Sequence, residues 1–221
     1  MSSFNTKHIN TSRMVSAMWL VCFILFSITA TAQKATVLLY GPNDDGRTYS
    51  SIEEALQATG PVYRLKITKL SKRDSLPEEL FKLTELRELT VKGCRLCIVN
   101  QRIGELKHLQ YLNLDRNKLV HLPNAIGQLT ELRKLTASRN LLETLPDSIS
   151  KLKQLTSIDV WDNPMYFLPE SINALENTLQ TLDIRQIPIR KSELEAMEKL
   201  LPKTQILFTD ICECENRRDH D

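Results

Sequence analysis

The chain has 221 residues, 42% of them hydrophobic, and 29 Lys and Arg residues stand against 27 Asp and Glu residues. Two of the basic residues, Lys7 and Arg13, lie in an N-terminal targeting segment, so the rest of the chain is formally neutral. A chain with no net positive charge and no basic block lacks the main attraction for nucleic acids and anionic membranes. We therefore exclude nucleic acid as a partner and expect one domain with a sizeable core.

The N-terminus has the features of a secretory signal. Lys7 and Arg13 precede an apolar run over residues 14–30, and the small-x-small sequence Ala30-Thr31-Ala32 follows where a signal peptidase would cut. We expect residues 1–32 to be removed, so that the mature chain is secreted, periplasmic or on the cell surface. An uncleaved anchor is the alternative, although the run is slightly shorter than the about 20 residues that span a bilayer. No second long apolar run follows, so we expect no stable membrane insertion after cleavage.

Residues 33–61 are predicted to form an N-terminal cap. Residues 35–40 read as a strand, and residues 50–57 read as a helix that begins with capping serines. The dipeptide Gly60-Pro61 then ends this helix. The cap would cover the first of the repeats that follow.

Residues 62–190 contain six copies of one pattern. Their central apolar residues recur at spacings of 23 or 24, as Leu65, Leu89, Leu112, Leu135, Ile158 and Leu182. The shared template L-x-x-L-x-L-x-x-N-x-L-x-x-L-P-x-x-I-x-x-L is the leucine-rich repeat signature, and this part of the chain resembles that family. The half L-P-x-x-I-G-x-L is similar to the short-repeat class of intracellular Ras-related scaffolds and many secreted bacterial proteins, and the signal points to the second group. The resemblance implies an α/β solenoid of six repeats, with a curved parallel sheet on the concave face and short helices or irregular turns on the convex face.

Elementary physics accounts for the template. Leu112 and Leu114 alternate with polar residues, as the buried side of a strand does. A buried Asn117 can turn the chain by bonding backbone groups, and Asn140 and Asn163 would continue it as a ladder. Pro123 limits the convex segment to a short helix. Because one repeat cannot cover its own leucines, the repeats must stack.

Two copies depart from the template. Cys94 replaces the ladder Asn in the second copy, where Val99-Asn100 also replaces Leu-Pro, and Ile187 replaces the Asn in the sixth. We expect Cys94 to be buried and inert. The ladder should therefore end at Asn163.

Residues 191–209 are predicted to form a C-terminal cap. The sequence Ser192-x-x-Glu195 would start an amphipathic helix that Pro202 ends, and residues 204–208 would add a seventh strand. The ending LLPKTQILF resembles the C-terminal cap of secreted bacterial leucine-rich repeat proteins. Residues 210–221 form a charged tail.

The cysteines do not form a convincing metal site. A Cys-x-x-Cys pair at residues 94 and 97 and a Cys-x-Cys pair at residues 212 and 214 would lie about 24 Å apart along the stacked strands, so that one zinc ion cannot join them. A bridge between Cys94 and Cys97 is poorly placed, because one points inward and the other outward. A local or an intermolecular disulfide of Cys212 and Cys214 remains open.

The sequence contains no recognisable catalytic motif. A phosphate loop, G-x-S-x-G and H-E-x-x-H are all absent, and GPNDDGR at residues 41–47 lacks the alternating oxygen ligands of a calcium loop. We therefore expect no cofactor, no metal and no enzymatic activity. A cysteine-dependent ligase fused to repeats is the enzymatic alternative, but only 13 residues follow Phe208.

The outward strand residues form a grid whose identities the core does not dictate. Basic residues gather on the first two strands and acidic residues on the last ones, which would orient a partner of opposite polarity. Large aromatics on a strand face are typical of binding hot spots, although Trp161 could instead pack on Tyr111 or a neighbouring level. The residues predicted to bind a partner are Arg64, Lys66, Lys92, Tyr111, Asp115, Lys134, Asp159, Trp161, Asp183 and Arg185.

These observations favour a secreted, non-enzymatic recognition module that binds a protein or peptide on its concave face. The alternative is a structural or self-associating envelope protein that uses the capping strands or the tail cysteines. Oligomeric state distinguishes the two hypotheses. The structural hypothesis requires an oligomer that depends on protein concentration or is dissociated by reductant.

Overall fold

The computed structural model describes residues 44–70 and 74–209. The chain divides into two compact units, residues 1–46 and residues 47–221. The predicted signal, the predicted strand over residues 35–40, Cys212 and Cys214 lie outside the described residues. The second unit contains the repeats.

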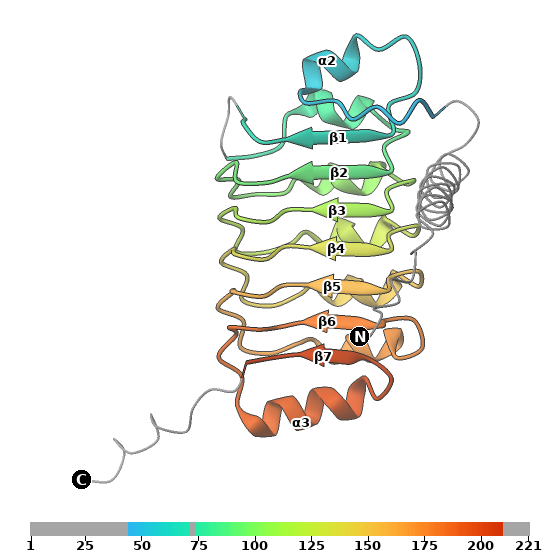
Figure 1. The fold of residues 1–221 in the computed structure, drawn as a ribbon. Helices are drawn as coiled ribbons and strands as arrows, with labels where there is room; N and C mark the ends of the chain where they lie inside the picture. Colours follow the sequence, from blue (N-terminus) through green and yellow to red (C-terminus); the bar gives the residue numbers. More distant parts are fainter. Residues whose placement is uncertain (1–43, 71–73, 210–221) are drawn as a thin grey trace, which may run out of the picture. The chain divides into compact units, whose positions relative to one another are not determined.

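The repeats form one parallel sheet whose seven strands follow each other in chain order (Figure 1). The strands are β1 (Arg64–Ile67), β2 (Glu88–Val91), β3 (Tyr111–Asn113), β4 (Lys134–Thr136), β5 (Ser157–Asp159), β6 (Thr181–Asp183) and β7 (Gln205–Leu207). Their pairing register aligns the central apolar residues Leu65, Leu89, Leu112, Leu135, Ile158, Leu182 and Ile206 across all seven strands. The predicted stacking of the six repeats is thereby confirmed.

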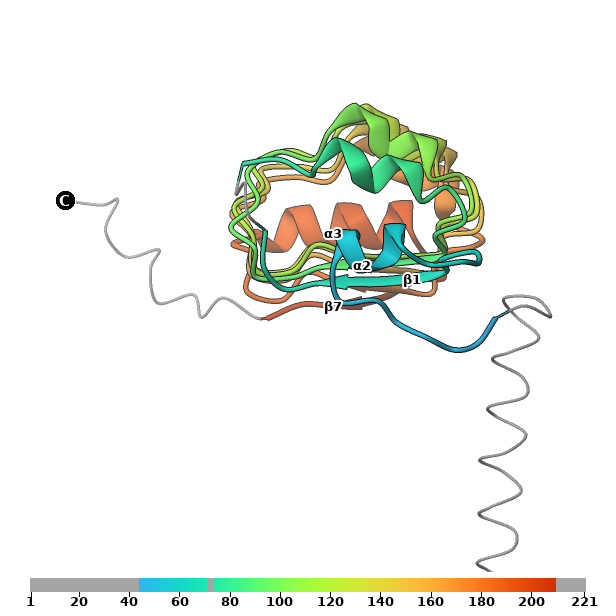
Figure 2. The ribbon, with the colours of Figure 1, turned by 90° about the horizontal axis from the view of Figure 1, so that it is seen from above.

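Short 3-10 helices lie opposite the sheet, as Figure 2 shows along the stack. They are η1 (Glu78–Lys82), η2 (Gln101–Glu105), η3 (Asn124–Gln128), η4 (Asp147–Lys151) and η5 (Glu170–Leu175). Proline precedes four of them, for example Pro123 before η3, and its fixed φ suits a helix start. In the second repeat Asn100 takes this place, and its side chain accepts from the Arg102 N–H at 2.9 Å. The predicted short convex helices are confirmed.

The core fills the space between the sheet and the 3-10 helices. Leu112, Leu135 and Ile158 are fully buried, as are Ile126 and Leu129 on the convex side. The packing there is close enough to require glycine. A Cβ on Gly127 would lie 2.5 Å from the carbonyl oxygen of Ser148 on the next level. The glycine in L-P-x-x-I-G-x-L thus lets consecutive convex helices approach each other.

A ladder of buried asparagines joins consecutive levels. The Asn117 side chain donates to the carbonyls of Val91 and Leu114 at 2.7 and 2.8 Å, and it accepts from the Cys94 N–H at 3.0 Å. Asn140 and Asn163 donate to equivalent carbonyls one and two levels further on, and they accept from the N–H groups of Leu119 and Leu142. Each side chain therefore satisfies backbone groups of two levels that the core would otherwise leave unpaired. The predicted ladder is confirmed.

A second recurring feature, a residue with positive φ that forms a backbone hydrogen bond to the next level, follows the strands. In the second to fifth copies, the residue before the ladder position has a positive φ and donates its N–H to a carbonyl of the next level, as Arg116 does to Ser138 at 2.9 Å and Arg139 to Trp161 at 3.0 Å. Gly93 is the glycine in this series, at φ 69°. A left-handed non-glycine residue costs roughly 1–2 kcal/mol, and the bond to the next level offsets part of this cost.

Cys94 lies in the ladder position of the second repeat, as predicted. It is 5% exposed, and its thiol donates to the carbonyls of Ile67 and Lys92 at 3.6 Å. Burial raises the pKa of this thiol, which disfavours the reactive thiolate. Cys94 and Cys97 are both free thiols.

Helices cover the described ends of the stack. Helix α2 (Ile52–Leu56) begins after Ser51, whose side chain accepts from the Glu54 N–H at 3.1 Å. Helix α3 (Lys191–Leu200) buries Met197. The predicted capping box is wrong in its residues, because the Arg190 N–H donates to the Glu193 carboxylate at 2.9 Å and the helix starts before Ser192. The cap is Arg190, so Lys191 and Ser192 both lie in the first turn of the helix. The spacing from Ser192 to Glu195 was the basis of the incorrect prediction.

The ladder predicts a large effect of removing one asparagine. Asn140→Ala leaves the Leu119 N–H without its side-chain acceptor and removes one of two ladder bonds to each of the carbonyls of Leu114 and Ala137, to which Asn117 and Asn163 also donate. Since an unsatisfied buried group costs about 1–3 kcal/mol and each further lost hydrogen bond about 1 kcal/mol, we expect the free energy of unfolding to fall by about 3 kcal/mol in chemical denaturation. Asn124→Ala, on the exposed start of η3, is the matched control. Equal denaturation midpoints for the two variants would contradict a structural role of the ladder.

The outward sheet face as a candidate binding site

The candidate site is the side of the sheet that faces away from the core, called the sheet face below. Parallel pairing places its residues in rows, since Tyr111 lies opposite Lys134 and Asp159 lies between Thr136 and Asp183. Neighbouring parallel strands lie about 4.8 Å apart, so residues of one row can touch a common ligand. The fold thus brings the predicted residues of β1 to β6 onto one surface.

Ion pairs within the sheet face reduce the predicted charge separation. Lys92 pairs with Asp115 at 3.7 Å. Arg185 pairs with Asp183 at 2.6 Å. Arg64 lies 3.6 Å from Glu88, and its side chain is only 9% exposed. The expected division into a basic end and an acidic end is therefore weaker than predicted, because each end carries both signs. Arg64 also contributes less accessible surface than its strand position suggested.

Trp161 is half-buried and leans on the preceding level. The Arg139 guanidinium lies 4.5 Å from the centre of its ring, within the range of a cation–π contact. Arg139 is held in turn by Asp162 at 3.5 Å. The sequence left open whether Trp161 would pack on Tyr111 or on a neighbouring level. The structure shows it packed on the neighbouring level, against Arg139. The indole remains accessible in part and is oriented by a charged neighbour.

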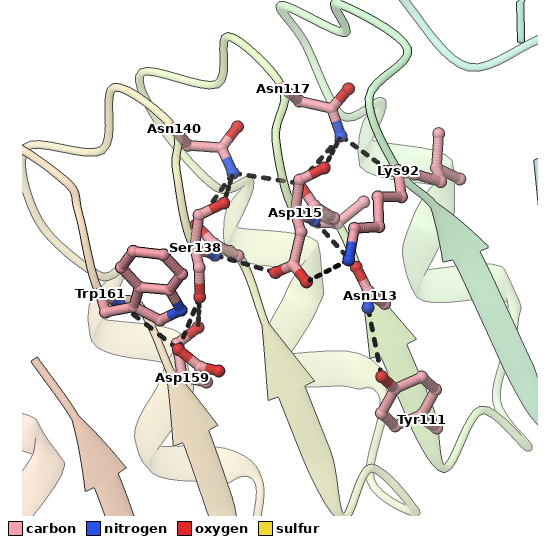
Figure 3. A network of polar contacts seen from close by, with 12 residues as sticks. Lys92, Tyr111, Asn113, Asp115, Asn117, Ser138, Asn140, Asp159 and Trp161 are labelled. Atoms are coloured by element: carbon pink, nitrogen blue, oxygen red, sulfur yellow. Dashed lines mark hydrogen bonds and ion pairs between the residues drawn. The ribbon is translucent and has the colours of Figure 1, made fainter. Parts of the chain in front are cut away.

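Tyr111 lies on β3, at the other end of the network in Figure 3. Its hydroxyl accepts from the Asn113 side chain at 3.2 Å. The Lys134 ammonium lies 5.8 Å from the centre of its ring. Tyr111 and Trp161 thus stand on either side of a central polar region, with Lys134 between their strands.

A chain of polar contacts links four levels across this central region (Figure 3). Asp115 pairs with Lys92 and accepts from the Ser138 N–H at 3.0 Å. The Ser138 hydroxyl donates to Asp159 at 2.5 Å. The backbone nitrogen of Trp161 lies 3.5 Å from the same Asp159 oxygen. The network fixes the side chains of the centre before any partner binds.

Asp159 differs from the other acids of the sheet face. Its partners are a hydroxyl and an amide rather than a cation. Burial raises the pKa of its carboxyl, and the negative charges of Asp183 and Asp115 raise it further, while the bonds from Ser138 and Trp161 act against this. A raised pKa means that ionisation of Asp159 disfavours the folded state. A carboxyl group with a raised pKa at the centre of a surface is a candidate functional group.

The described residues contain no cluster of metal-binding side chains. No group of three or more His, Cys, Asp or Glu side chains that could hold a metal ion occurs among residues 44–70 and 74–209. One hydroxyl of the sheet face, that of Thr136, is buried without a hydrogen-bond partner. The chemistry that the surface offers is contact by aromatic, hydroxyl and charged groups.

The sequence-based prediction omitted a second surface, on the side where the chain leaves the strands. Ile98 is 60% exposed and Leu141 is 50% exposed there. Tyr166 and Phe167 are also exposed, one level beyond Leu141. Comparison of equivalent repeat positions could have revealed it, since the template position of Val120 holds Glu143 in the next copy.

Comparison with protein families identifies the chain. The family described as "Leucine-rich repeat region" matches residues 85–205, more than half of the chain. The chain belongs to the leucine-rich repeat family. Members of this family are in general protein-interaction modules. No curated protein matches the chain.

Solved leucine-rich repeat structures resemble this one. A leucine-rich repeat protein of Leptospira interrogans is 33% identical over 66% of this chain and 35% of its own, with a TM-score of 0.58. Internalin C2 of Listeria monocytogenes is 16% identical over 73% of this chain and 67% of its own, with a TM-score of 0.56. A plant peptide hormone receptor, solved with the peptide RGF2, is 23% identical over 68% of this chain and 28% of its own, with a TM-score of 0.50. This chain spans about a third of the length of the Leptospira protein, and the last two likenesses show the fold alone.

Among the described residues, no helix has the length and apolar character needed to cross a membrane. The apolar run over residues 14–30 lies outside them.

Replacement of the Asp159 carboxylate by a neutral amide is predicted to stabilise the fold. Because its pKa is raised in the folded state, the associated stability is present at acidic pH and is lost as the pH rises through that pKa. Asp159→Asn keeps the acceptor oxygen for Ser138 and removes the charge. We expect this variant to unfold at higher denaturant concentration than wild type near neutral pH, and the difference to shrink at about pH 4. Glu143→Gln, at an exposed position, is the control, and a less stable Asp159→Asn at neutral pH would contradict the account.

Proposed function

We propose that the mature chain is a secreted, non-enzymatic recognition module that binds a protein or peptide on its sheet face. The observation that carries the proposal is the preset centre of this face, where Tyr111 and Trp161 flank the network of Asp115, Ser138 and Asp159. The core requires none of these side chains, because the strand side chains that face the core are aliphatic, such as Leu112, Leu135 and Ile158. Aromatic residues held in place by their neighbours lose little conformational freedom on binding and dominate binding energies.

Two further observations support the proposal. The N-terminal sequence up to Ala32 has the charged start, apolar run and small-x-small end of a cleaved secretory signal. The plant receptor with the same fold was solved in complex with a peptide hormone. Such a likeness supports a binding role for the leucine-rich repeat surface and leaves the partner to be identified by the chemistry of this chain.

Peptide selection on the purified protein tests the proposed surface. Peptides are selected from a random display library on wild type, and their affinities are measured for Trp161→Ala combined with Tyr111→Ala. We expect the double variant to lose at least about 2 kcal/mol of binding free energy, roughly thirtyfold in affinity, as hot-spot aromatics do.

Tyr166→Ala is the matched control, because Tyr166 is an exposed aromatic outside the sheet face. It should bind the selected peptides as wild type does, and circular dichroism should show that all variants are folded. Equal binding by wild type and the folded double variant would exclude the sheet face as the site.

A further inference from the structure

A groove of about 760 Å³ lies on the side of the solenoid where the chain leaves β2 to β4. It is called the flank groove below. Its volume falls within the about 300–1,000 Å³ of known ligand sites. More than half of its lining residues are aliphatic: Ile98, Val99, Val120, Leu122, Pro123 and Leu141.

The fold does not require the exposed apolar residues of the flank groove. Ile98, Leu141 and Val120 are 60%, 50% and 36% exposed. The equivalent position of Leu141 in the preceding copy is Lys118, and that of Val120 in the following copy is Glu143. Single exposed hydrophobic residues are ordinary, but several gathered around one recess mark an interaction site.

Lys118 supplies the one permanently charged group of the lining. Arg95 occupies the equivalent position one copy earlier and is exposed, with φ at 60° in the left-handed region. Neither cation forms an ion pair with the residues described here. The nearest levels also carry the exposed acids Asp74 and Glu143, but neither lines the groove. The groove thus combines an apolar floor with a cation that a ligand carboxylate could pair with.

The openness of the groove favours a polypeptide as its occupant. Its rim residues Ile98 and Leu141 are at least half exposed, so it does not enclose a ligand as a lipid-carrying cavity would. A recess is also unlike the protruding apolar surface that inserts into a membrane. An extended chain can lay its side chains into such a recess and continue beyond both ends.

We propose that the flank groove binds an extended segment of a partner protein, with apolar side chains on its floor and an acidic side chain paired with Lys118. This site is separate from the sheet face and does not depend on the function proposed for that face. A partner could occupy either surface alone or both together, which would add avidity.

Protection of Cys97 tests the proposal directly, because this thiol is free, exposed and part of the lining. The experiment uses a variant with Cys22, Cys212 and Cys214 changed to Ser. Its reaction with neutral iodoacetamide is followed by mass spectrometry, and buried Cys94 is the internal unreactive reference. The probes are synthetic peptides that alternate Leu with Glu, Leu with Lys, or Ser with Glu.

We expect the Leu–Glu peptide to slow modification of Cys97 at least fivefold in a saturable way, and the other two peptides to protect at least fivefold less well at the same concentration. Lys118→Glu should transfer the preference to the Leu–Lys peptide. Lys151→Glu, an equal charge change on the convex helix η4, should leave the preference unchanged. Trp161→Ala with Tyr111→Ala should also leave it unchanged, so failure of the sheet face does not affect this test.

Several results would overturn the proposal. These are equal protection by all three peptides, the same peptide preference in Lys118→Glu, or no protection at all. Protection by decanoate or by phosphatidylglycerol vesicles without protection by the Leu–Glu peptide would also overturn it, and would assign the groove to lipid.

Discussion

Burial of the leucines between neighbouring levels is the constraint on which the whole structure depends. One level has a single strand and one short 3-10 helix, and too little chain to cover its own aliphatic side chains. Leu112 is fully buried because Leu89 and Leu135 lie on either side of it in the same row. Stacking in turn brings backbone groups into the core at every strand end, and the asparagine ladder satisfies them. The regular spacing of 23 or 24 residues keeps the aliphatic rows and the ladder in register from level to level.

The same constraint leaves the outward surfaces free to vary. Stability resides in the aliphatic rows, the ladder and the close approach at Gly127, so the sheet face can carry groups that weaken the fold. Asp159 is such a group, since its ionised form is disfavoured by burial and by two neighbouring carboxylates. The exposed aliphatic residues of the flank groove are another departure from what folding requires. Stacked repeats tolerate such local costs because each level adds its own stabilising contacts.

Periodicity predicted the backbone well because it reflects burial. The positions of β1 to β6, the ladder from Asn117 to Asn163 and the short convex helices all follow from which residues must face the core. The start of α3 could not be placed as well, because serine is a favoured cap residue and arginine is not, and the bond from the Arg190 N–H to Glu193 depends on side-chain conformation.

Surface chemistry followed from the sequence only in part. The rows of the sheet face could be written down from the alternation, but the pairing of Arg185 with Asp183 and the stacking of Arg139 on Trp161 depend on side-chain conformation. The flank groove was missed because its exposed apolar residues, Ile98, Val120 and Leu141, occupy variable positions of the template, where a pattern based on the core carries no information. Partner binding by the ten predicted residues stays a prediction.

Removal of one complete repeat tests the central claim most directly. Deletion of residues 118–140 joins Asn117 to Leu141 and removes 23 residues, one full period. If the levels are interchangeable copies that stabilise one another by stacking, the shortened chain should unfold cooperatively in urea. Its circular dichroism should resemble that of wild type, and its denaturation midpoint should be lower. Deletion of residues 121–140, which breaks the period, should abolish cooperative unfolding. Loss of the folded state in both deletions, or its retention in both, would contradict the account.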